Sequence, residues 1–219
     1  MKNSIIAGVI MLASTGLFSQ VGINGGYSNF AVSEWMELMN VVTGKNFENA
    51  TGYKVGVDYW LRLKQRRIEF LPELGYASLK ASSVGSEANF KLAGLYFNTN
   101  IYPFDFEGDC DCPTWSKSGG VFEKGFFIQV TPGITMATIK VNDELTISDE
   151  TVTYLLIGVG AGVDLGISEN ITITPMIKYS ISQKTEYLPS TNSLIDFGPV
   201  SANAKQLILG VRVGLNLGR

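Results

Sequence analysis

The sequence predicts an all-β fold: an antiparallel up-and-down transmembrane β-barrel of about eight strands, with a short helix in the first extracellular loop. Three observations lead to this prediction. Apolar and polar residues alternate along most of the chain, several alternating segments have nine or more residues, and short connections alternate with long ones. Downstream of Gln20 there is no apolar run of the length that a spanning helix needs, so membrane-spanning helices are not expected.

The first part of the chain has the features of an export signal. Met1–Asn3 carries a positive charge, Ile5–Leu12 is apolar, and Ala13–Gln20 is rich in small residues. We therefore expect residues 1–19 to be a cleaved signal peptide and residues 20–219 to form the barrel domain. A buried N-terminal strand or helix is the alternative.

Eight segments carry the alternating pattern of strands that have one apolar face. The clearest run from Tyr154 to Ile167 and from Leu207 to Leu217, and a strand of this length matches what a tilted strand needs to cross a bilayer. The other six segments are Ile23–Tyr27, Tyr53–Leu61, Ile68–Tyr76, Ala93–Ile101, Phe126–Met136 and Ile171–Ile181.

The connections between these segments alternate in length. Lys64–Arg67 and Ser168–Asn170 are tight polar turns, and the connection near 104–125 is the one long segment on the same side. Both termini are then periplasmic, and the long loops are extracellular. The predicted long loops lie near 31–50, 80–89, 138–150 and 183–203.

The second face of the predicted strands holds cations and anions in nearly equal number. A barrel of eight strands has an interior that side chains fill, so we expect these charges to pair and plug the lumen. Two alternatives stay open: part of the network binds a small polar solute or gates a narrow path, or the chain is a water-soluble barrel with its apolar face inside. The charged positions are Lys54, Asp58, Arg62, Glu69, Glu73, Lys91, Asp164, Lys178 and Arg212, and Gln129 shares their face.

Three prolines lie on the apolar face inside predicted strands, namely Pro72, Pro132 and Pro175. Proline removes a hydrogen bond from the ladder between strands. Because the three occur in alternate strands at similar depth, we expect bulges that bend the barrel wall at one level.

The first long loop contains a segment with helical spacing of apolar residues, which includes Trp35, Met36 and Met39. One interpretation is a short rim helix that packs on the barrel mouth. The other is a helix that caps the lumen or presents these three side chains to a protein partner.

Cys110 and Cys112 lie in the long connection near 104–125. In an exported protein, two cysteines favour a disulfide, either within this Cys-x-Cys pair or with partner chains. A metal site, a redox-active bridge and free thiols are the alternatives, although the neighbouring carboxylates fit no known metal loop.

The heptapeptide Phe70–Tyr76, with the sequence FLPELGY after a short basic turn, resembles a strand common in the outer-membrane β-barrel family of Bacteroidetes, which includes PorT-like proteins. Phe18–Gln20 is similar to leader ends of that group, and the layout of 21–219 fits it. The resemblance implies an outer-membrane barrel, and in some members assistance to a protein-secretion machine. The C-terminal Asn216–Arg219 departs from the family because it lacks the aromatic last residue that the barrel assembly machinery recognises.

Taken together, these patterns predict a small outer-membrane protein with a structural or accessory role, in contact with protein partners. Binding or narrow transport of a small solute is the alternative, and an outer-membrane enzyme is disfavoured because the chain has no histidine to act as general base. The net charge of −3 gives no basic field for nucleic acid. The expected partners are outer-membrane lipid, the barrel assembly machinery and other envelope proteins, with no cofactor.

Overall fold

The computed structural model shows a closed barrel of eight antiparallel strands, as the alternating pattern predicts. In the part of the chain that it describes, no helix is long and apolar enough to span a membrane. The described residues are 20–43, 46, 48–63, 66–83, 86–106, 120–142, 147–187 and 200–216.

Neighbouring strands of the barrel are also neighbours along the chain, and the first strand pairs with the last to close the cylinder. A short strand, β7 (Leu165–Gly166), continues β6 along β8 in the same register. The barrel strands are β1 (Gln20–Val32), β2 (Ala50–Arg62), β3 (Ile68–Ser83), β4 (Ser86–Ile101), β5 (Phe126–Asn142), β6 (Ile147–Val163), β8 (Ile171–Ser182) and β11 (Ala204–Asn216).

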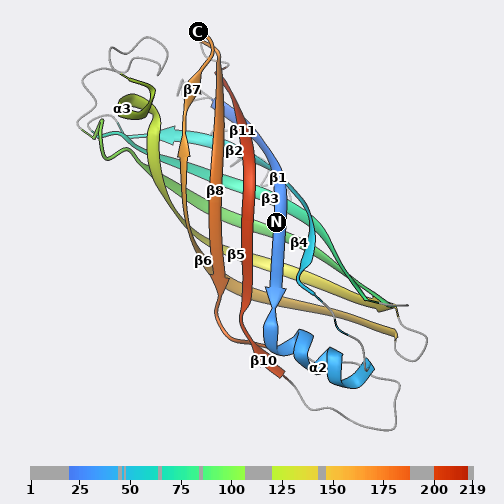
Figure 1. The fold of residues 1–219 in the computed structure, drawn as a ribbon. Helices are drawn as coiled ribbons and strands as arrows, with labels where there is room; N and C mark the ends of the chain where they lie inside the picture. Colours follow the sequence, from blue (N-terminus) through green and yellow to red (C-terminus); the bar gives the residue numbers. More distant parts are fainter. Residues whose placement is uncertain are drawn as a thin grey trace, which may run out of the picture.

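The two ends of the barrel differ (Figure 1). At one end, here called the termini end, β1 begins, β11 ends, and the short helix α3 (Val121–Gly125) precedes β5. The opposite end, here called the α2 end, carries helix α2 (Ser33–Thr43), the predicted helix of the first loop. It also carries the two-stranded sheet of β9 (Thr185–Tyr187) and β10 (Val200–Ala202).

Large apolar side chains on alternate residues cover the outside of the barrel, and the other residues of each strand point inward. This outer apolar band is exposed on every barrel strand, as a wall surrounded by lipid requires. Its large members include Ile23, Tyr27, Tyr53, Val55, Val57, Leu74, Tyr76, Leu95, Phe97, Ile128, Ile134, Met136, Leu155, Ile157, Val159, Ile177, Tyr179, Ile181, Leu207, Leu209, Val211, Val213 and Leu215.

Strands β3 to β6 continue past the outer apolar band at the α2 end, and there the two faces exchange character. On β3, for example, the outward side chains change from Leu74 and Tyr76 to Lys80, whereas the inward ones change from Glu73 to Leu79. The β3–β6 extension, as we call this part, consists of Ala77–Ser83, Ser86–Leu92, Ala137–Asn142 and Ile147–Tyr154.

The predicted long loops near 80–89 and 138–150 are therefore wrong, because most of those residues belong to the strands of the extension. The tight turns after β2 and before β8 are confirmed, and so is the long connection after β4 at the termini end.

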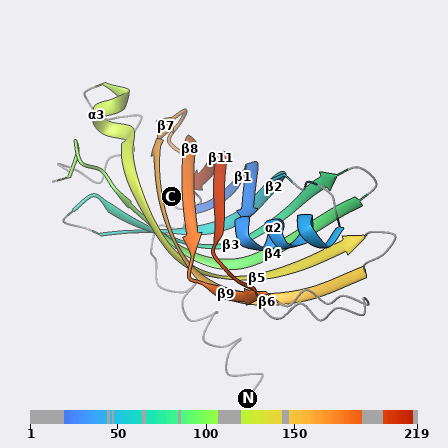
Figure 2. The ribbon, with the colours of Figure 1, turned by 60° about the horizontal axis from the view of Figure 1, so that its bottom comes forward.

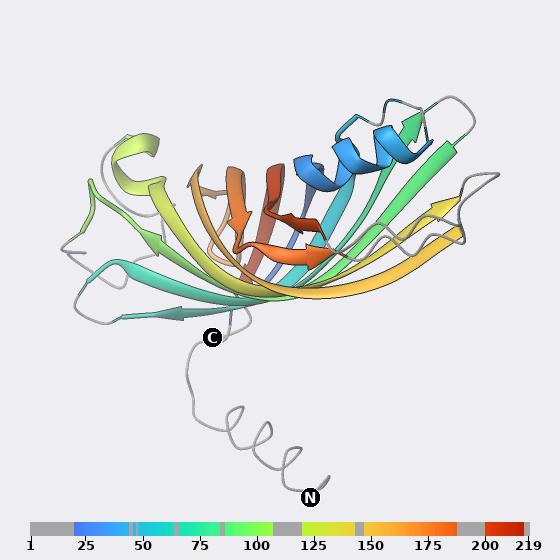
Figure 3. The ribbon, with the colours of Figure 1, turned by 90° about the horizontal axis from the view of Figure 1, so that it is seen from below.

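The inside of the extension is an apolar core that α2 covers. Trp35 and Met36 of α2 are 2% and 5% exposed, and the Trp35 ring meets Phe90 edge-on at 5.6 Å between centroids. Phe30 of β1 packs on the same Phe90 at 5.4 Å. Figures 2 and 3 show α2 on the concave side of the curved sheet formed by β3 to β6.

The interpretation of this segment as a short helix that packs on the barrel mouth and caps the lumen therefore agrees with the structure. The alternative in which Trp35 and Met36 face a protein partner is wrong, because both side chains are buried against the barrel interior. The side chain of Met39 lies outside the described residues.

The prolines interrupt the ladder, but they make no bulge. At Pro72 the β2–β3 pairing lapses between the Asp58–Glu73 pair and the Leu61–Phe70 pair, and the register is the same on both sides. The β4–β5 pairing lapses in the same way at Pro132, and the pairing of β8 with β6 and β7 at Pro175. At each proline, two residue pairs are therefore missing from the ladder on one side of the strand. Neither strand gains an extra residue relative to its partner.

Candidate functional site in the barrel interior

The barrel interior between the α2 cap and the termini end is polar, and its positive and negative charges are equal in number. Among the described residues the buried charged side chains are four cations and four anions. Burying a charge is costly unless it is paired and hydrogen-bonded, so the contacts of each group decide what this interior can do. The eight residues are Lys54, Arg67, Lys178, Arg212, Asp58, Glu69, Glu73 and Asp164.

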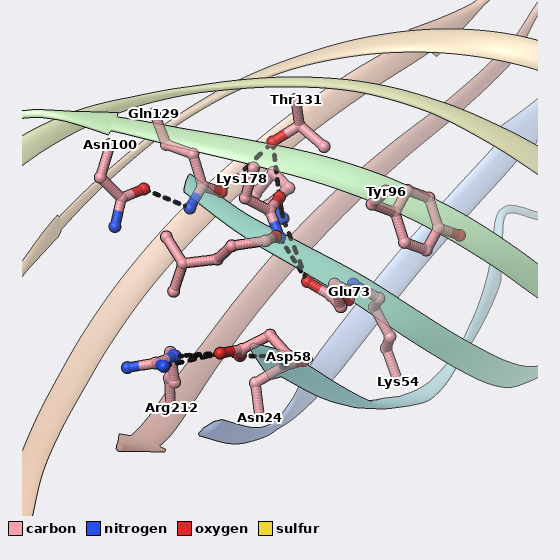
Figure 4. Close-up of polar contacts among 12 residues, drawn as sticks. Asn24, Lys54, Asp58, Glu73, Tyr96, Asn100, Gln129, Thr131, Lys178 and Arg212 are labelled. Carbon is pink, nitrogen blue, oxygen red and sulfur yellow. Dashed lines mark hydrogen bonds and ion pairs between the residues drawn. The ribbon is translucent and has the colours of Figure 1, made fainter. Parts of the chain in front are cut away.

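Glu73 is the centre of the first group of contacts (Figure 4). Its carboxylate pairs with Lys54 of β2, and its Oε2 atom accepts a hydrogen bond of 2.7 Å from Asn98 Nδ2 of β4. Lys178 of β8 lies across the lumen, with its Nζ atom 3.8 Å from Glu73 Oε2 and 2.7 Å from Asn98 Oδ1. Thr131 of β5 donates to the same Asn98 oxygen at 2.8 Å. Four strands besides β3 thus meet at one carboxylate and its amide neighbour.

Asp58 and Arg212 form the second group. The guanidinium of Arg212 on β11 contacts both carboxylate oxygens, with Nε–Oδ2 at 2.9 Å and Nη2–Oδ1 at 2.6 Å. Asn24 of β1, which lies between these two strands, adds a weaker contact of 3.4 Å to Asp58 Oδ2. A two-pronged arginine–carboxylate pair fixes geometry as well as charge. This pair connects β2 to β11 across β1, the strand that closes the barrel with β11.

The third group closes the termini end around Tyr102, which follows β4 and is fully buried. The Tyr102 hydroxyl lies 2.8 Å from Glu69 Oε2 and 2.5 Å from Asp164 Oδ2. Burial, together with these two carboxyl groups, raises the pKa of the Tyr102 phenol well above its usual range. Tyr102 therefore stays protonated, and its single hydroxyl hydrogen can be donated to Glu69 or to Asp164.

Arg67 holds the long connection after β4 against this end of the barrel. Its guanidinium lies 4.0 Å from the centre of the Tyr102 ring and contacts Asp105 and the backbone carbonyl of Lys124. Its backbone N–H donates to the carbonyl of Phe106 at 3.0 Å. One buried arginine thus binds both arms of the connection to the wall.

Tyr96 separates the polar interior from the apolar core under α2. Its ring lies against Gly75, Gly94 and Gly133, where an added Cβ would come within 3.0 Å of it. Lys54 Nζ stands 4.6 Å from the ring centre, and Thr135 donates to the Tyr96 hydroxyl at 3.1 Å. The glycines are needed here because their lack of a side chain lets a large ring lie flat across three strands.

A small cavity remains among the polar groups. Its wall includes Asn24, Asn100, Gln129, Lys178 and Arg212, and Gln129 Nε2 donates to Asn100 Oδ1 at 2.7 Å. A polar space of this kind is suited to water molecules or a very small polar solute.

The structure brings together seven of the nine charged residues named from the sequence. Lys91 is exposed on the outer wall, so its assignment to the lumen is wrong: it lies an even number of residues from Leu95 and shares the outward face of β4. Arg62 is half-buried at the rim, opposite Glu69 in the β2–β3 register. Cys110 and Cys112 lie outside the described residues.

Sequence reasoning missed several residues that complete the interior. Arg67 lies in a predicted turn and Tyr102 just after a predicted strand, so neither belongs to an alternating segment. Asn98 shares the inward face of β4 with Tyr96, and the period-two pattern of that strand contained the information needed to place it.

No protein-family model and no curated protein sequence matches the chain. Among solved structures, Neisserial surface protein A aligns with a TM-score of 0.52 at 13% identity, over 92% of this chain and 98% of that one. Ail, the attachment invasion locus protein of Yersinia pestis, aligns with a TM-score of 0.45 at 13% identity, over 91% of this chain and 100% of that one. At such identities the likeness concerns the fold, which is that of the small eight-stranded outer-membrane β-barrels.

Proposed function

We propose that this protein is an outer-membrane barrel with a closed lumen that acts as an accessory or scaffold through its ends and not as a pore or an enzyme. The observation that carries the proposal is the double closure of the interior. An ion-paired layer around Glu73 and the Asp58–Arg212 pair fills the termini half, and the apolar core under Trp35 fills the other half.

Membrane insertion is supported by the outer apolar band. Its segments, such as Tyr53–Leu61 and Ile68–Tyr76, contain nine residues. At about 3.3 Å per residue and the tilt of about 40° usual in such barrels, they span roughly 23 Å, close to the ~25 Å apolar height of outer-membrane barrels. Tyr27, Tyr53 and Tyr76 are exposed on the outside near the α2 end, where aromatic rings are favoured at a bilayer interface.

Heat-modifiable migration tests the membrane proposal. The protein, extracted from an outer-membrane fraction, is run on a gel with and without boiling, and we expect the unboiled form to migrate faster because the barrel stays folded in detergent. Recovery of the protein in the soluble periplasmic fraction would contradict the proposal. Protease added to whole cells tests orientation: cleavage confined to the α2 end supports extracellular exposure of that end.

Planar-bilayer conductance tests the closed lumen. We expect wild-type protein to be silent, and also a Trp35→Ala/Met36→Ala variant, because the polar layer remains. The quadruple variant, which adds Asp58→Ala and Arg212→Ala, removes part of the polar layer as well as part of the apolar core. Only this quadruple variant is expected to conduct. Heat-modifiable migration of each variant serves as the folding control. Steady conductance by the wild-type protein would rule out the closed lumen.

The second candidate is binding or narrow transport of a small polar solute, which the cavity beside Lys178 and Arg212 favours. Swelling of proteoliposomes in small amino acids or sugars measures it. Swelling by wild type that is lost in Asn100→Leu or Gln129→Leu, which replace polar groups of the cavity wall by apolar ones of similar size, would favour this function over the scaffold.

The proposed accessory role agrees with the family that the Phe70–Tyr76 heptapeptide suggests, the PorT-like outer-membrane barrels of Bacteroidetes. We propose that the chain belongs to this family. Glu73 of that heptapeptide is the centre of the buried network, so the motif has a structural reason in this chain. Mild detergent extraction followed by identification of co-purifying envelope proteins tests the role. Recovery of the barrel alone, with unchanged protein secretion in a deletion strain, would contradict it.

A further inference from the structure

The outer wall has a distinct charge pattern just beyond the outer apolar band at the α2 end. The pattern concerns the first two outward-facing positions of each strand that continues past the band. Every charged residue at these positions is a lysine, namely Lys80 of β3, Lys91 of β4, Lys140 of β5 and Lys205 of β11. The other positions carry Asn, Ser, Thr or Ala. The chain as a whole has more acidic than basic residues, so this pattern is not a consequence of composition.

Three of the lysines are neighbours on adjacent strands. Asn89 of β4 is paired with Lys80 on one side and with Lys140 on the other, and Lys91 is the next outward residue of the same strand. Strands in a sheet lie about 4.8 Å apart, so these flexible side chains can reach a common anion.

Two acidic residues lie beside this group. Asp149 of β6 is the register partner of Lys140, so Lys140 has an acidic neighbour of its own. The other acidic residue, beside Lys80, does not neutralise that lysine. Glu87, one position farther from the band on β4, lies 3.8 Å from Lys80, and both side chains are more than half exposed (64% and 55%). An ion pair this long and exposed contributes little, and each ammonium has three donors. Glu87 also stands on the side of the lysines that faces away from the apolar band.

We propose that Lys80, Lys91 and Lys205 bind the phosphate groups of lipid headgroups in the leaflet at the α2 end. The inference rests on the proposed membrane insertion, which places these side chains at the level where the apolar wall meets the headgroups. The tyrosines of the outer apolar band mark the same level on the neighbouring strands: Tyr53 is paired directly with Ser78, the residue that also faces Lys91. The lysines lie on the lipid side of the wall, continuous with the band, and their charge is complementary to phosphate.

The test compares two variants with the same loss of charge. Lys80→Gln/Lys91→Gln removes two of the proposed contacts, whereas Arg66→Gln/Lys124→Gln removes two cations at the termini end. Each protein is reconstituted into phosphatidylcholine nanodiscs doped with phosphatidylglycerol, and the lipids that stay bound after gentle detergent extraction are measured by native mass spectrometry. Inorganic phosphate in the buffer serves as a soluble competitor.

Wild type is expected to retain phosphatidylglycerol over phosphatidylcholine. The affinity should fall about five-fold for each lysine removed, with little change in the termini-end control. Loss of retention in phosphate buffer of constant ionic strength would point to phosphate as the recognised group. Equal retention by wild type and both variants, in protein that still migrates as a heat-modifiable barrel, would overturn the lipid site and leave the membrane proposal intact. Failure to insert into nanodiscs would instead overturn the membrane proposal, and the lipid site with it.

Discussion

Asp58 and Arg212 show what a single buried pair contributes to this barrel. With one partner neutralised, the other keeps its charge in an interior that offers little water, which is why such losses are costly. We expect Asp58→Asn to lower the free energy of unfolding by about 3 to 5 kcal/mol, and Asp58→Asn/Arg212→Gln to recover part of it. Urea titration in detergent, followed by tryptophan fluorescence, measures both.

The exposed pair of Lys80 and Glu87 is the matched control for this experiment. Glu87→Gln should change the free energy of unfolding by less than about 1 kcal/mol, because solvent screens the pair. An equal loss in Asp58→Asn and Glu87→Gln would show that the buried pair contributes nothing beyond a surface contact.

Tyr102 predicts a dependence of stability on alkaline pH. Its pKa is raised by burial and by the neighbouring carboxyl groups, so above about pH 10 the folded protein keeps a proton that the unfolded chain loses. Stability then falls as pH rises toward the folded pKa, by about 1.4 kcal/mol per pH unit from this group. Tyr102→Phe should remove that part of the slope, as measured by urea titrations at several alkaline pH values. Parallel slopes for wild type and variant would contradict the assignment.

At the level of single residues, the sequence predicts which charges enter the lumen better than which partners they meet. Alternation places Glu73, Asp58 and Arg212 inside correctly, because a strand allows only two directions. It does not show that Asn98 bridges Glu73 and Lys178, since that contact depends on how far β4 and β8 lie from each other across the barrel. Lys91 is the exception: its parity with Leu95, which is visible in the sequence, places it on the outer face and not in the lumen.

Among the elements, α2 is the one for which the sequence leaves several interpretations open and the structure decides between them. Helical spacing locates the helix, but it does not decide whether its apolar side faces solvent, a partner or the lumen. The structure resolves this because the inside of the β3–β6 extension is apolar and needs a cover.

A prediction follows for α2 as an element. Trp35→Ala should leave a void beside Phe90 and lower the stability of the α2 end by about 3 to 5 kcal/mol. Hydrogen exchange of Ser33–Thr43 should then speed up, while β8 and β11 stay protected. Val41→Ala, at a side chain that is 73% exposed, is the control and should leave exchange unchanged. Uniform acceleration over the whole barrel would show that α2 is not a separate lid.

The change of parity along the strands explains why sequence patterns predict the outer apolar band well and the β3–β6 extension poorly. Within the outer apolar band, apolar residues keep one parity, so alternation locates all eight strands. Past Tyr76, Ala93 and Met136 the apolar residues move to the other parity, so a search for one continuous stripe stops there and assigns the rest to loops.

For the molecule as a whole, these faces predict where water and lipid meet the wall. In a Cys110→Ser/Cys112→Ser background, a cysteine at Ser82 or Asn89 should react with a membrane-impermeant maleimide in proteoliposomes. A cysteine at Leu95 or Ile157 should react only after detergent is added. Rapid labelling of Leu95→Cys in the bilayer would contradict the position of the outer apolar band.

The exchange of faces along β3 to β6 also bears on how this barrel can change in length. Adding two residues to each arm of the β5–β6 hairpin places one more polar side chain outside and one more apolar side chain inside on each arm. A single added residue instead turns every later side chain of the arm to the wrong face. The extension can therefore grow or shrink only in steps of two residues per strand, while the bilayer fixes the height of the part below it.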